Sequence, residues 1–395
     1  MRRSTLALLA CVCVFAAAVA FIVLRNNPPA LEGLPAGQEP ASPETLQSEP
    51  VSSTSVPSPA TQHEVAASTT SGGENHGAIP VAPLKFPNWP TPALALVATG
   101  EQLGYFEPCG CTGNQLGGMS RRASLFEKIR ALGWEVRGID VGSVSRRTGT
   151  QAKLKFDTTL AAFRELKYVG LALGPEELKL EPAYLLSQHL TDGDDPLKFL
   201  SANLMFFGSK DIGTPVSSMV FEVNGVRVGV SSVMSDTIRK SVIPDMTPEE
   251  AANAEVQWTD PAEALTSVMK EFDDAGATVR ILLAQTTLEE SKKLAEDYPN
   301  LTLIVRANGF GEGTDKPEMV GRVQLLEVGK KGKAAGVIGL YPDDTENPVR
   351  FELVPLSGDL FQDSERMTRL MQSYQDRLRS EAVARTDGTI PHPSG

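Results

Sequence analysis

Two neighbouring segments decide the fold: Ala93-Leu-Ala-Leu-Val-Ala-Thr99 and, after a short gap, Tyr105-Phe-Glu-Pro-Cys-Gly-Cys-Thr-Gly-Asn-Gln-Leu-Gly-Gly-Met-Ser-Arg-Arg122. The first segment is apolar and typical of a buried strand. The second is a glycine-rich loop, and a helical pattern of apolar residues begins after Gly117-Gly118. A strand, a long loop and a helix in this order predict an α/β domain with a functional site at the loop.

The composition limits the classes of function. The chain has 395 residues and a net charge of −12, and its basic residues form only short pairs such as Arg146-Arg147. A nucleic-acid-binding protein needs a positive stripe, so the composition argues against this class. Four cysteines are too few for a disulfide scaffold.

The N-terminus carries a targeting signal, in which Arg2-Arg3 precedes an uncharged, mostly apolar run from Thr5 to Leu24. About twenty such residues span a hydrocarbon core as a helix. We therefore expect a membrane anchor in residues 1–25, with the rest of the chain exported to the periplasm or another extracytoplasmic space. The alternatives are a cleaved signal peptide ending near Ala20 and lipid attachment at Cys11.

Residues 26–90 are rich in Pro, Ser, Thr, Ala, Glu and Gly, with only scattered aliphatic side chains. Such a segment cannot bury enough apolar surface to offset the entropy that it would lose on ordering. We expect a disordered linker that tethers the folded part to the membrane.

Residues 91–358 alternate short apolar runs with amphipathic segments, which predicts a mixed α/β domain. Asn224-Gly225 predicts the two-residue turn of a β-hairpin. Asp260-Pro261 predicts the start of a helix, with the aspartate as its cap. Three later apolar runs predict a closing group of antiparallel strands: 320–328, 334–340 and 349–354.

Residues 359–395 contain one more predicted helix, at about 364–383, and a tail that we expect to be disordered. Apolar side chains recur along one face of this helix at helical spacing. The stripe predicts packing on the helix's own domain or, alternatively, docking on a partner. Its members are Met367, Leu370, Met371, Tyr374 and Leu378.

Short motifs follow the predicted strands of the folded part: Thr99-Gly-Glu-Gln-Leu-Gly104, Gly117-Gly-Met-Ser-Arg121, Asp140-Val-Gly-Ser143, Gly174-Pro-Glu-Glu177, Ala202-Asn-Leu204, Gly225-Val-Arg-Val-Gly-Val230 and Leu283-Ala-Gln285. Their order resembles the calcineurin-like metallophosphoesterase superfamily, specifically its 5′-nucleotidase branch, over most of residues 93–355. The resemblance implies a mixed β-sheet sandwich flanked by helices. It also implies a site where two divalent metals clamp a phosphate and activate water.

The positions that match the family's ligands carry other residues. Glu101 replaces an aspartate and keeps a carboxylate. The five remaining substitutions are Leu103 for a histidine, Ser143 for the bridging aspartate, Pro175 for an asparagine, Glu176 for the catalytic histidine and Gln285 for a histidine. Only one histidine of four, His189, falls within the predicted domain. We therefore expect the two-metal site to be degenerate.

The carboxylates near these positions leave an alternative open. Hard cations such as Mg²⁺ or Ca²⁺ bind to clusters of oxygen ligands. A rebuilt site of this kind would support an active phosphoester hydrolase. Its ligands would be Glu101, Asp140, Glu176 and Glu177.

Glu107-Pro-Cys-Gly-Cys111, followed by Gly117–Arg122, resembles a narrower group of exported, planctomycete-type proteins associated with c-type cytochromes. Tyr374-Gln375 and His392-Pro-Ser-Gly395 stand where fused members of that group continue toward a haem segment. No Cys-x-x-Cys-His occurs, so we expect no covalent haem on this chain. The resemblance implies a c-type cytochrome partner on another chain.

The loop admits several interpretations of its own. Three interpretations fit Cys109 and Cys111. The first is a structural pair, the second is an easily reduced, redox-active disulfide, and the third is half of a soft-metal site that a partner completes. Arg121 and Arg122, at the start of a helix, are an anion-binding pair or an ordinary surface pair. Together the observations favour a membrane-tethered, non-hydrolytic binding or accessory module, with a hydrolase or a thiol redox accessory as alternatives.

Overall fold

The computed structural model describes residues 83–109, 115–188, 195–209, 214–309 and 311–386. The predicted anchor, nearly all of the linker, Cys111, His189 and all but the first three residues of the predicted C-terminal tail lie outside these ranges. Among the helices that are described, none combines the length and the apolar character needed to cross a membrane.

The first of two six-stranded sheets is built around β1 (Leu94–Thr99), whose six residues are all buried. The strand order is β14-β13-β1-β2-β3-β4. Strands β1 to β4 are parallel to one another, and β13 is antiparallel to both of its neighbours, β1 and β14. The other five strands are β2 (Val136–Asp140), β3 (Tyr168–Ala172), β4 (Lys198–Leu200), β13 (Ala334–Leu340) and β14 (Val349–Pro355).

The second sheet has the order β11-β12-β10-β9-β7-β6, in which β12, β10, β9 and β7 are parallel. The prediction of one closing antiparallel group is therefore wrong. The strand at 320–328 splits into parts of β11 and β12 in this sheet, whereas the next two strands join the first sheet. The strands are β6 (Ser218–Val223), β7 (Val226–Met234), β9 (Val279–Gln285), β10 (Leu303–Arg306), β11 (Glu318–Val320) and β12 (Val323–Glu327).

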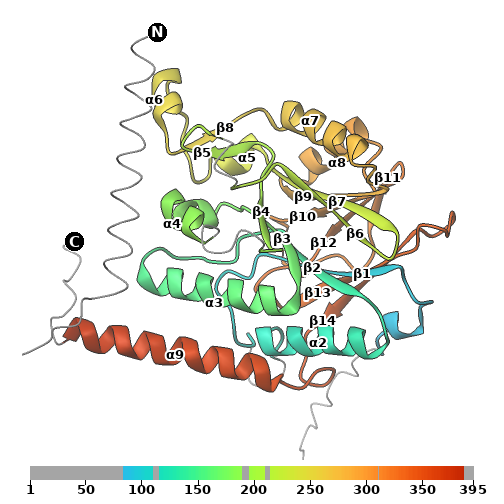
Figure 1. Cartoon of the computed structure of the whole chain (residues 1–395), viewed down its shortest axis with the longest axis horizontal. Helices are drawn as coiled ribbons and strands as arrows, with labels where there is room; N and C mark the ends of the chain where they lie inside the picture. Colours follow the sequence, from blue (N-terminus) through green and yellow to red (C-terminus); the bar gives the residue numbers. More distant parts are fainter. Residues whose placement is uncertain (1–82, 110–114, 189–194, 210–213, 310, 387–395) are drawn as a thin grey trace, which may run out of the picture. The chain divides into compact units, whose positions relative to one another are not determined.

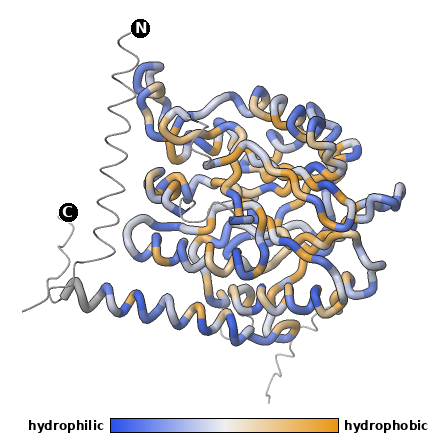
Figure 2. The backbone as a smooth tube through the Cα atoms, viewed as in Figure 1, coloured by the Kyte–Doolittle hydropathy of each residue, from blue (hydrophilic) through white to orange (hydrophobic). Residues whose placement is uncertain are grey.

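The two sheets pack face to face, and helices cover both outer faces (Figure 1). Because successive side chains of a strand point to opposite faces, Leu96 of β1 packs between the sheets while Val97 packs beneath the helices. The central strands are mostly hydrophobic (Figure 2). The covering helices are α2 (Met119–Ala131) and α3 (Thr150–Leu166) on the first sheet, and α7 (Pro261–Asp274) and α8 (Leu288–Asp297) on the second. Helix α9 (Glu365–Thr386) packs on the outside of α2 and α3.

Short elements connect these layers. The folded part begins before the predicted boundary at residue 91, because Phe86 of η1 is fully buried and its ring packs edge-on against Trp134. The short elements are η1 (Phe86–Asn88), η2 (Glu177–Lys179), α4 (Pro182–Ser187), β5 (Leu204–Phe206), α5 (Asp236–Arg239), α6 (Pro248–Asn253) and β8 (Val256–Trp258).

Two local predictions are confirmed. Asn224 and Gly225 join β6 to β7 with φ angles of 49° and 79°, and such positive values are those that Asn and Gly tolerate. The side chain of Asp260 caps α7 by accepting the N–H groups of Ala262 and Glu263.

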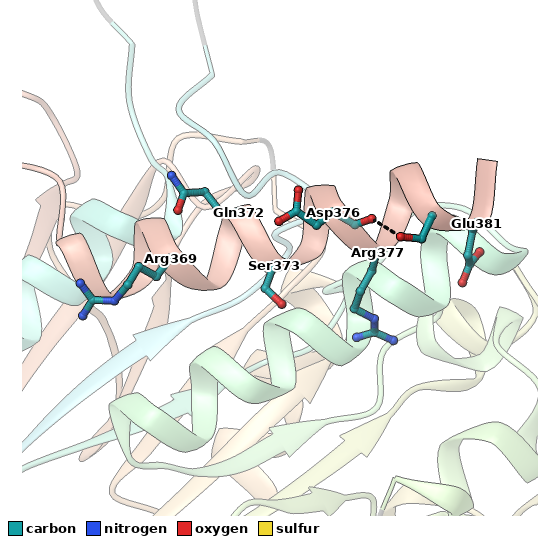
Figure 3. A pocket seen from close by; sticks show the side chains of 7 residues that line it. Arg369, Gln372, Ser373, Asp376, Arg377 and Glu381 are labelled. Atoms are coloured by element: carbon teal, nitrogen blue, oxygen red, sulfur yellow. Dashed lines mark hydrogen bonds between the residues drawn. The ribbon is translucent and has the colours of Figure 1, made fainter. Parts of the chain in front are cut away.

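The apolar stripe of α9 packs on its own domain, so that interpretation is confirmed. Tyr374 is 7% exposed, and its ring lies edge-on to Phe106 at 5.4 Å between centroids. Arg377 extends toward α3, where its Nη2 lies 3.5 Å from Asp157 (Figure 3). Polar side chains of α9 alone line an open surface hollow: Arg369, Gln372, Ser373, Asp376, Arg377, Ser380 and Glu381.

Candidate functional site

The loops that follow β1, β2, β3 and β9 meet at one edge of the sandwich, which we call the strand-end edge. The carboxyl ends of parallel strands are where α/β folds usually place their sites. The Glu101 N–H donates to the carbonyl oxygen of Gly142 at 2.7 Å. The Gln285 amide donates to the carbonyl oxygen of Val141. The structure therefore brings together the positions that the sequence resemblance singles out.

Glu177 is fully buried and joins two of these loops. Its Oε2 accepts the N–H groups of Ser143 at 2.7 Å and Gly174 at 2.9 Å, and its Oε1 accepts the N–H of Val144 at 2.7 Å. Burial raises the pKa of Glu177 to about 7, although these backbone N–H groups act in the opposite direction. The carboxylate holds the loops together and is not presented to a ligand.

Gln285 fills the space between the same loops. Its Nε2 donates to Val141 at 2.5 Å, and its Oε1 accepts the Nδ2 of Asn308 at 3.0 Å. A Cβ atom added to Gly142 or Gly174 would lie only 3.1 or 2.8 Å from this Nε2. Both polar atoms of the amide are therefore in use, and neither glycine has room for one more carbon.

Glu101 is 6% exposed and lies just after β1. Its Oε1 is 3.7 Å from the Nζ of Lys330, which comes from the turn between β12 and β13. Its carbonyl oxygen accepts the N–H of Lys331 at 2.7 Å. Burial raises the pKa of Glu101, and the Lys330 ammonium opposes that shift. A lysine is thus the counter-ion of the carboxylate at the first ligand position.

Asp140, the last residue of β2, is fully buried. Its Oδ2 accepts the hydroxyl of Thr99 at 2.6 Å, and its Oδ1 accepts the N–H of Gly142 at 2.8 Å. Burial raises the pKa of Asp140, and the nearby Arg122 guanidinium opposes that shift. Asp140 is a core residue that faces away from any external ligand.

The Leu103 N–H donates to the carbonyl oxygen of Ser143 at 2.9 Å, but the side chains at the three remaining ligand positions have different surroundings. Glu176 forms an ion pair with Lys179 at 2.7 Å. Pro175 is half-buried and has no side-chain donor. Leu103 is half-buried and lines a small cavity beside the strand-end edge.

These residues do not fit a metal centre. Within the described ranges, no three or more His, Cys, Asp or Glu side chains are grouped so as to hold a metal ion. A hard cation needs several oxygen ligands around one point. Glu101, Asp140 and Glu177 are each bound to protein partners, and Glu176 pairs with Lys179 through its Oε1 while its buried Oε2 has no hydrogen-bond partner. The described residues therefore show no ligand cluster for the one-cation site considered from the sequence. Its proposed ligands were Glu101, Asp140, Glu176 and Glu177.

The arginine pair at the start of α2 is not an anion site either. Arg122 is 1% exposed and lies inside the domain, near Asp140 and over the ring of Phe163. Arg121 donates to the carbonyl oxygen of Gln115 at 2.6 Å. The two guanidiniums are directed to different protein partners, so they do not form the expected surface pair.

Cys109 is partly buried in the loop after β1, and its N–H donates to the carbonyl oxygen of Leu116 at 2.8 Å. It lines a larger cavity that adjoins the one beside Leu103. Since Cys111 lies outside the described residues, the structural, redox and shared-metal interpretations of the pair stay predictions.

Sequence reasoning did not single out Lys330 as a site residue. The available signal was the Gly329-Lys-Lys-Gly-Lys333 turn, the densest group of lysines in the domain. Such a group usually indicates a solvated turn, and only the tertiary structure places one of its ammonium groups beside a buried carboxylate.

Comparison with protein-family models and with curated protein sequences finds no match. Among solved structures, the chain is similar to a 5′-nucleotidase precursor from Thermus thermophilus, with a TM-score of 0.60 and 20% identity over 73% of this chain and 59% of that one. It is also similar to the sulfate thiohydrolase SoxB of Thermus thermophilus, with a TM-score of 0.57 and 14% identity over 74% of this chain and 62% of that one.

A third similar structure is the calcineurin-like phosphoesterase YfkN from Bacillus subtilis, with a TM-score of 0.53 and 17% identity over 72% of this chain and 97% of that one. The chain spans about three fifths of the length of the first two structures. It has the fold of 5′-nucleotidases and calcineurin-like phosphoesterases, as the sequence motifs implied. At these identities the likeness concerns the fold alone.

Proposed function

We propose that this chain is an exported, membrane-tethered protein whose phosphoesterase-like domain binds a ligand or partner without hydrolysing it, beside a c-type cytochrome on another chain. The tether is supported by the apolar run Thr5–Leu24. The cytochrome association is supported by the resemblance carried by Glu107–Cys111 and Gly117–Arg122.

The loss of hydrolysis is supported by one observation: the groups at the strand-end edge are already committed to protein partners. Glu177 is bound to backbone N–H groups, Gln285 uses both of its polar atoms, and Glu101 is paired with Lys330. Two-metal hydrolysis needs anionic ligands that hold the metals and thereby activate water. The residues present do not supply that ligand set.

The test measures bound metal and turnover on the purified full chain. The protein is dialysed against Mg²⁺, Mn²⁺ or Zn²⁺, its metal content is determined by mass spectrometry, and hydrolysis of AMP and 4-nitrophenyl phosphate is followed. We expect substoichiometric metal and no turnover above the buffer rate. Stoichiometric metal together with turnover that Glu101→Ala abolishes would refute the proposal and favour the rebuilt hydrolase.

A comparison variant makes the negative result informative. Leu103→His, Ser143→Asp and Gln285→His together restore three ligand types that the resemblance implies. If the scaffold still tolerates metal, this triple variant binds more metal than the parent chain in the same dialysis. An equal metal content in both proteins would mean that the substituted positions are not what limits binding.

A further inference from the structure

Two adjoining cavities lie beside the strand-end edge. Both are open to solvent. The smaller, about 310 Å³, is bordered by the loops at 103–105 and 145–148 and by the first residues of α3. The larger, about 700 Å³, is bordered by the loop at 104–109, by α3 and by α9. Both are lined by Gly104, Tyr105, Gln151 and Lys155, so they form two chambers of one hollow.

The small chamber is basic. Arg146, Arg147 and Lys155 line it, and no acidic residue is among its lining. Neither guanidinium has an ion-pair partner in the part of the chain that the structure describes. Arg146 and Arg147 are exposed to solvent, and with Lys155 they form a basic patch in a chain with a net charge of −12, which favours the binding of an external anion.

Lys155 is the residue that joins the chambers. Its Nζ donates to the carbonyl oxygen of Gly104 at 3.0 Å and lies 5.7 Å from the centre of the Phe106 ring. Burial and the nearby Arg147 lower the pKa of Lys155, whereas Glu107, which lines the large chamber, acts in the opposite direction. An anion beside Lys155 and Arg147 would add to the compensation that Glu107 supplies.

The start of α3 adds to the same field. The helix has 17 residues, its N-cap is Gly149, and no side chain caps its first N–H groups. A helix N-terminus carries a partial positive charge and free N–H donors, which favour an anion nearby. Thr148 and Gln151 of this segment also line the small chamber.

The large chamber is mixed in character. Tyr105, Phe106, Met371, Tyr374 and Leu378 give it aromatic and aliphatic walls, and its charged groups lie among them. The Nζ of Lys331 lies 5.2 Å from the centre of the Tyr105 ring. This contact holds the Tyr105 side chain at the junction of the chambers, both of which it lines. The lining of the large chamber also includes the polar and charged side chains of Glu107, Gln151, Lys155, Gln375 and Arg379. A lining that mixes apolar walls with polar groups suits a small organic molecule that carries polar groups of its own.

We propose that the hollow binds a small organic molecule carrying a phosphate or sulfate group, with the anion in the small chamber and the organic part in the large one. This inference gives the proposed binding module its ligand class. It rests on that proposal only for the expectation that the ligand is not hydrolysed.

The experiment measures binding of 4-nitrophenyl phosphate, 4-nitrophenyl sulfate and inorganic phosphate to the purified full chain by calorimetry at low salt. We expect both nitrophenyl esters to bind more tightly than inorganic phosphate, because only they reach the large chamber. Arg147→Gln and Lys155→Gln should each weaken binding about tenfold or more, since each removes a charged hydrogen-bond donor. Tyr105→Ala should weaken binding of the esters and leave inorganic phosphate unchanged.

Lys153→Gln is the matched control. It removes the same charge from the same helix, but Lys153 pairs with Glu181 at 2.9 Å and does not line the hollow. It should change the dissociation constant less than about twofold, because the lost charge is distant and screened. Thermal unfolding monitored by circular dichroism verifies that each variant is folded.

The outcomes separate the two proposals. Absence of binding, or affinities that Arg147→Gln and Lys155→Gln leave unchanged, would overturn the inference about the hollow. Equal affinity for inorganic phosphate and the esters would overturn the role of the large chamber. Release of 4-nitrophenolate would instead overturn the non-hydrolytic function, and the hollow would still stand if the variants weakened binding. The two esters, compared with each other, distinguish a phosphate from a sulfate ligand.

Discussion

The Glu177 carboxylate should give the fold a distinctive dependence on pH. Burial raises its pKa in the folded protein to about 7, from an ordinary value of 4.5. Between these two values the unfolded chain has released the proton while the folded chain still holds it. Stability is therefore full below pH 4.5 and is lost as the pH rises through 7.

The size of the effect follows from the two pKa values. Each pH unit between them costs about 1.4 kcal/mol, and integrating from pH 5 to pH 8 gives a loss of about 2.5 kcal/mol in the free energy of unfolding. Because burial also raises the pKa of Glu101 and Asp140, these groups contribute with the same sign. The share of Glu177 is obtained by comparison with a variant that cannot titrate there.

Glu177→Gln is that variant, and denaturant unfolding at several pH values is the assay. At pH 5 the variant should be less stable than the parent by about 1 to 3 kcal/mol, because its amide nitrogen cannot accept a backbone N–H. Raising the pH to 8 should narrow this gap by about 2.5 kcal/mol. A gap that instead widens would show that the backbone N–H groups hold the carboxylate ionised, and would refute the reasoning.

Three further changes test the packing around the site. Lys330→Met removes the counter-ion of the buried Glu101 and should lower the free energy of unfolding by about 1 to 3 kcal/mol. Lys293→Met is the control, because Lys293 pairs with Asp297 on the exposed surface, and it should change the free energy of unfolding little in the same assay. Gly138→Ala should lower the free energy of unfolding, measured with denaturant, by about 1 to 3 kcal/mol, because its new Cβ would lie 2.3 Å from the Tyr168 ring. An unchanged denaturation midpoint would contradict this packing. Tyr374→Ala should cost about 3 kcal/mol and should speed protease cleavage of α9, and equal cleavage rates would show that this ring does not hold the helix.

The overall fold was predicted from the order of its motifs, and the details that were predicted are those that a few adjacent residues determine. The hairpin turn at Asn224-Gly225 and the cap at Asp260 depend on local backbone preferences. The assignment of the strands after residue 318 to two different sheets was not predictable in this way. Apolar alternation indicates that a strand has a buried face, but it does not identify the sheet that the strand joins.

The candidate site shows the same limit. The family resemblance placed Glu101, Ser143 and Gln285, with Leu103, Pro175 and Glu176, at one site that follows the strand ends. Sequence reasoning treated Glu177 as a possible metal ligand, whereas the structure directs the carboxylate to backbone N–H groups from two loops. The direction of a peptide N–H depends on the loop conformation, which the residue types alone do not reveal.

The charges at the strand-end edge explain how the loops remain ordered with protein partners alone. A cluster of carboxylates around a common centre would repel itself, so each remaining acid needs compensation of its own. Glu101 has Lys330, Asp140 has Thr99 and the nearby Arg122, and Glu177 has its backbone donors. Arg146 and Arg147 take no part in this compensation. Both are exposed, so their charges are open to solvent and to the anionic ligand that we propose for the hollow next to the edge.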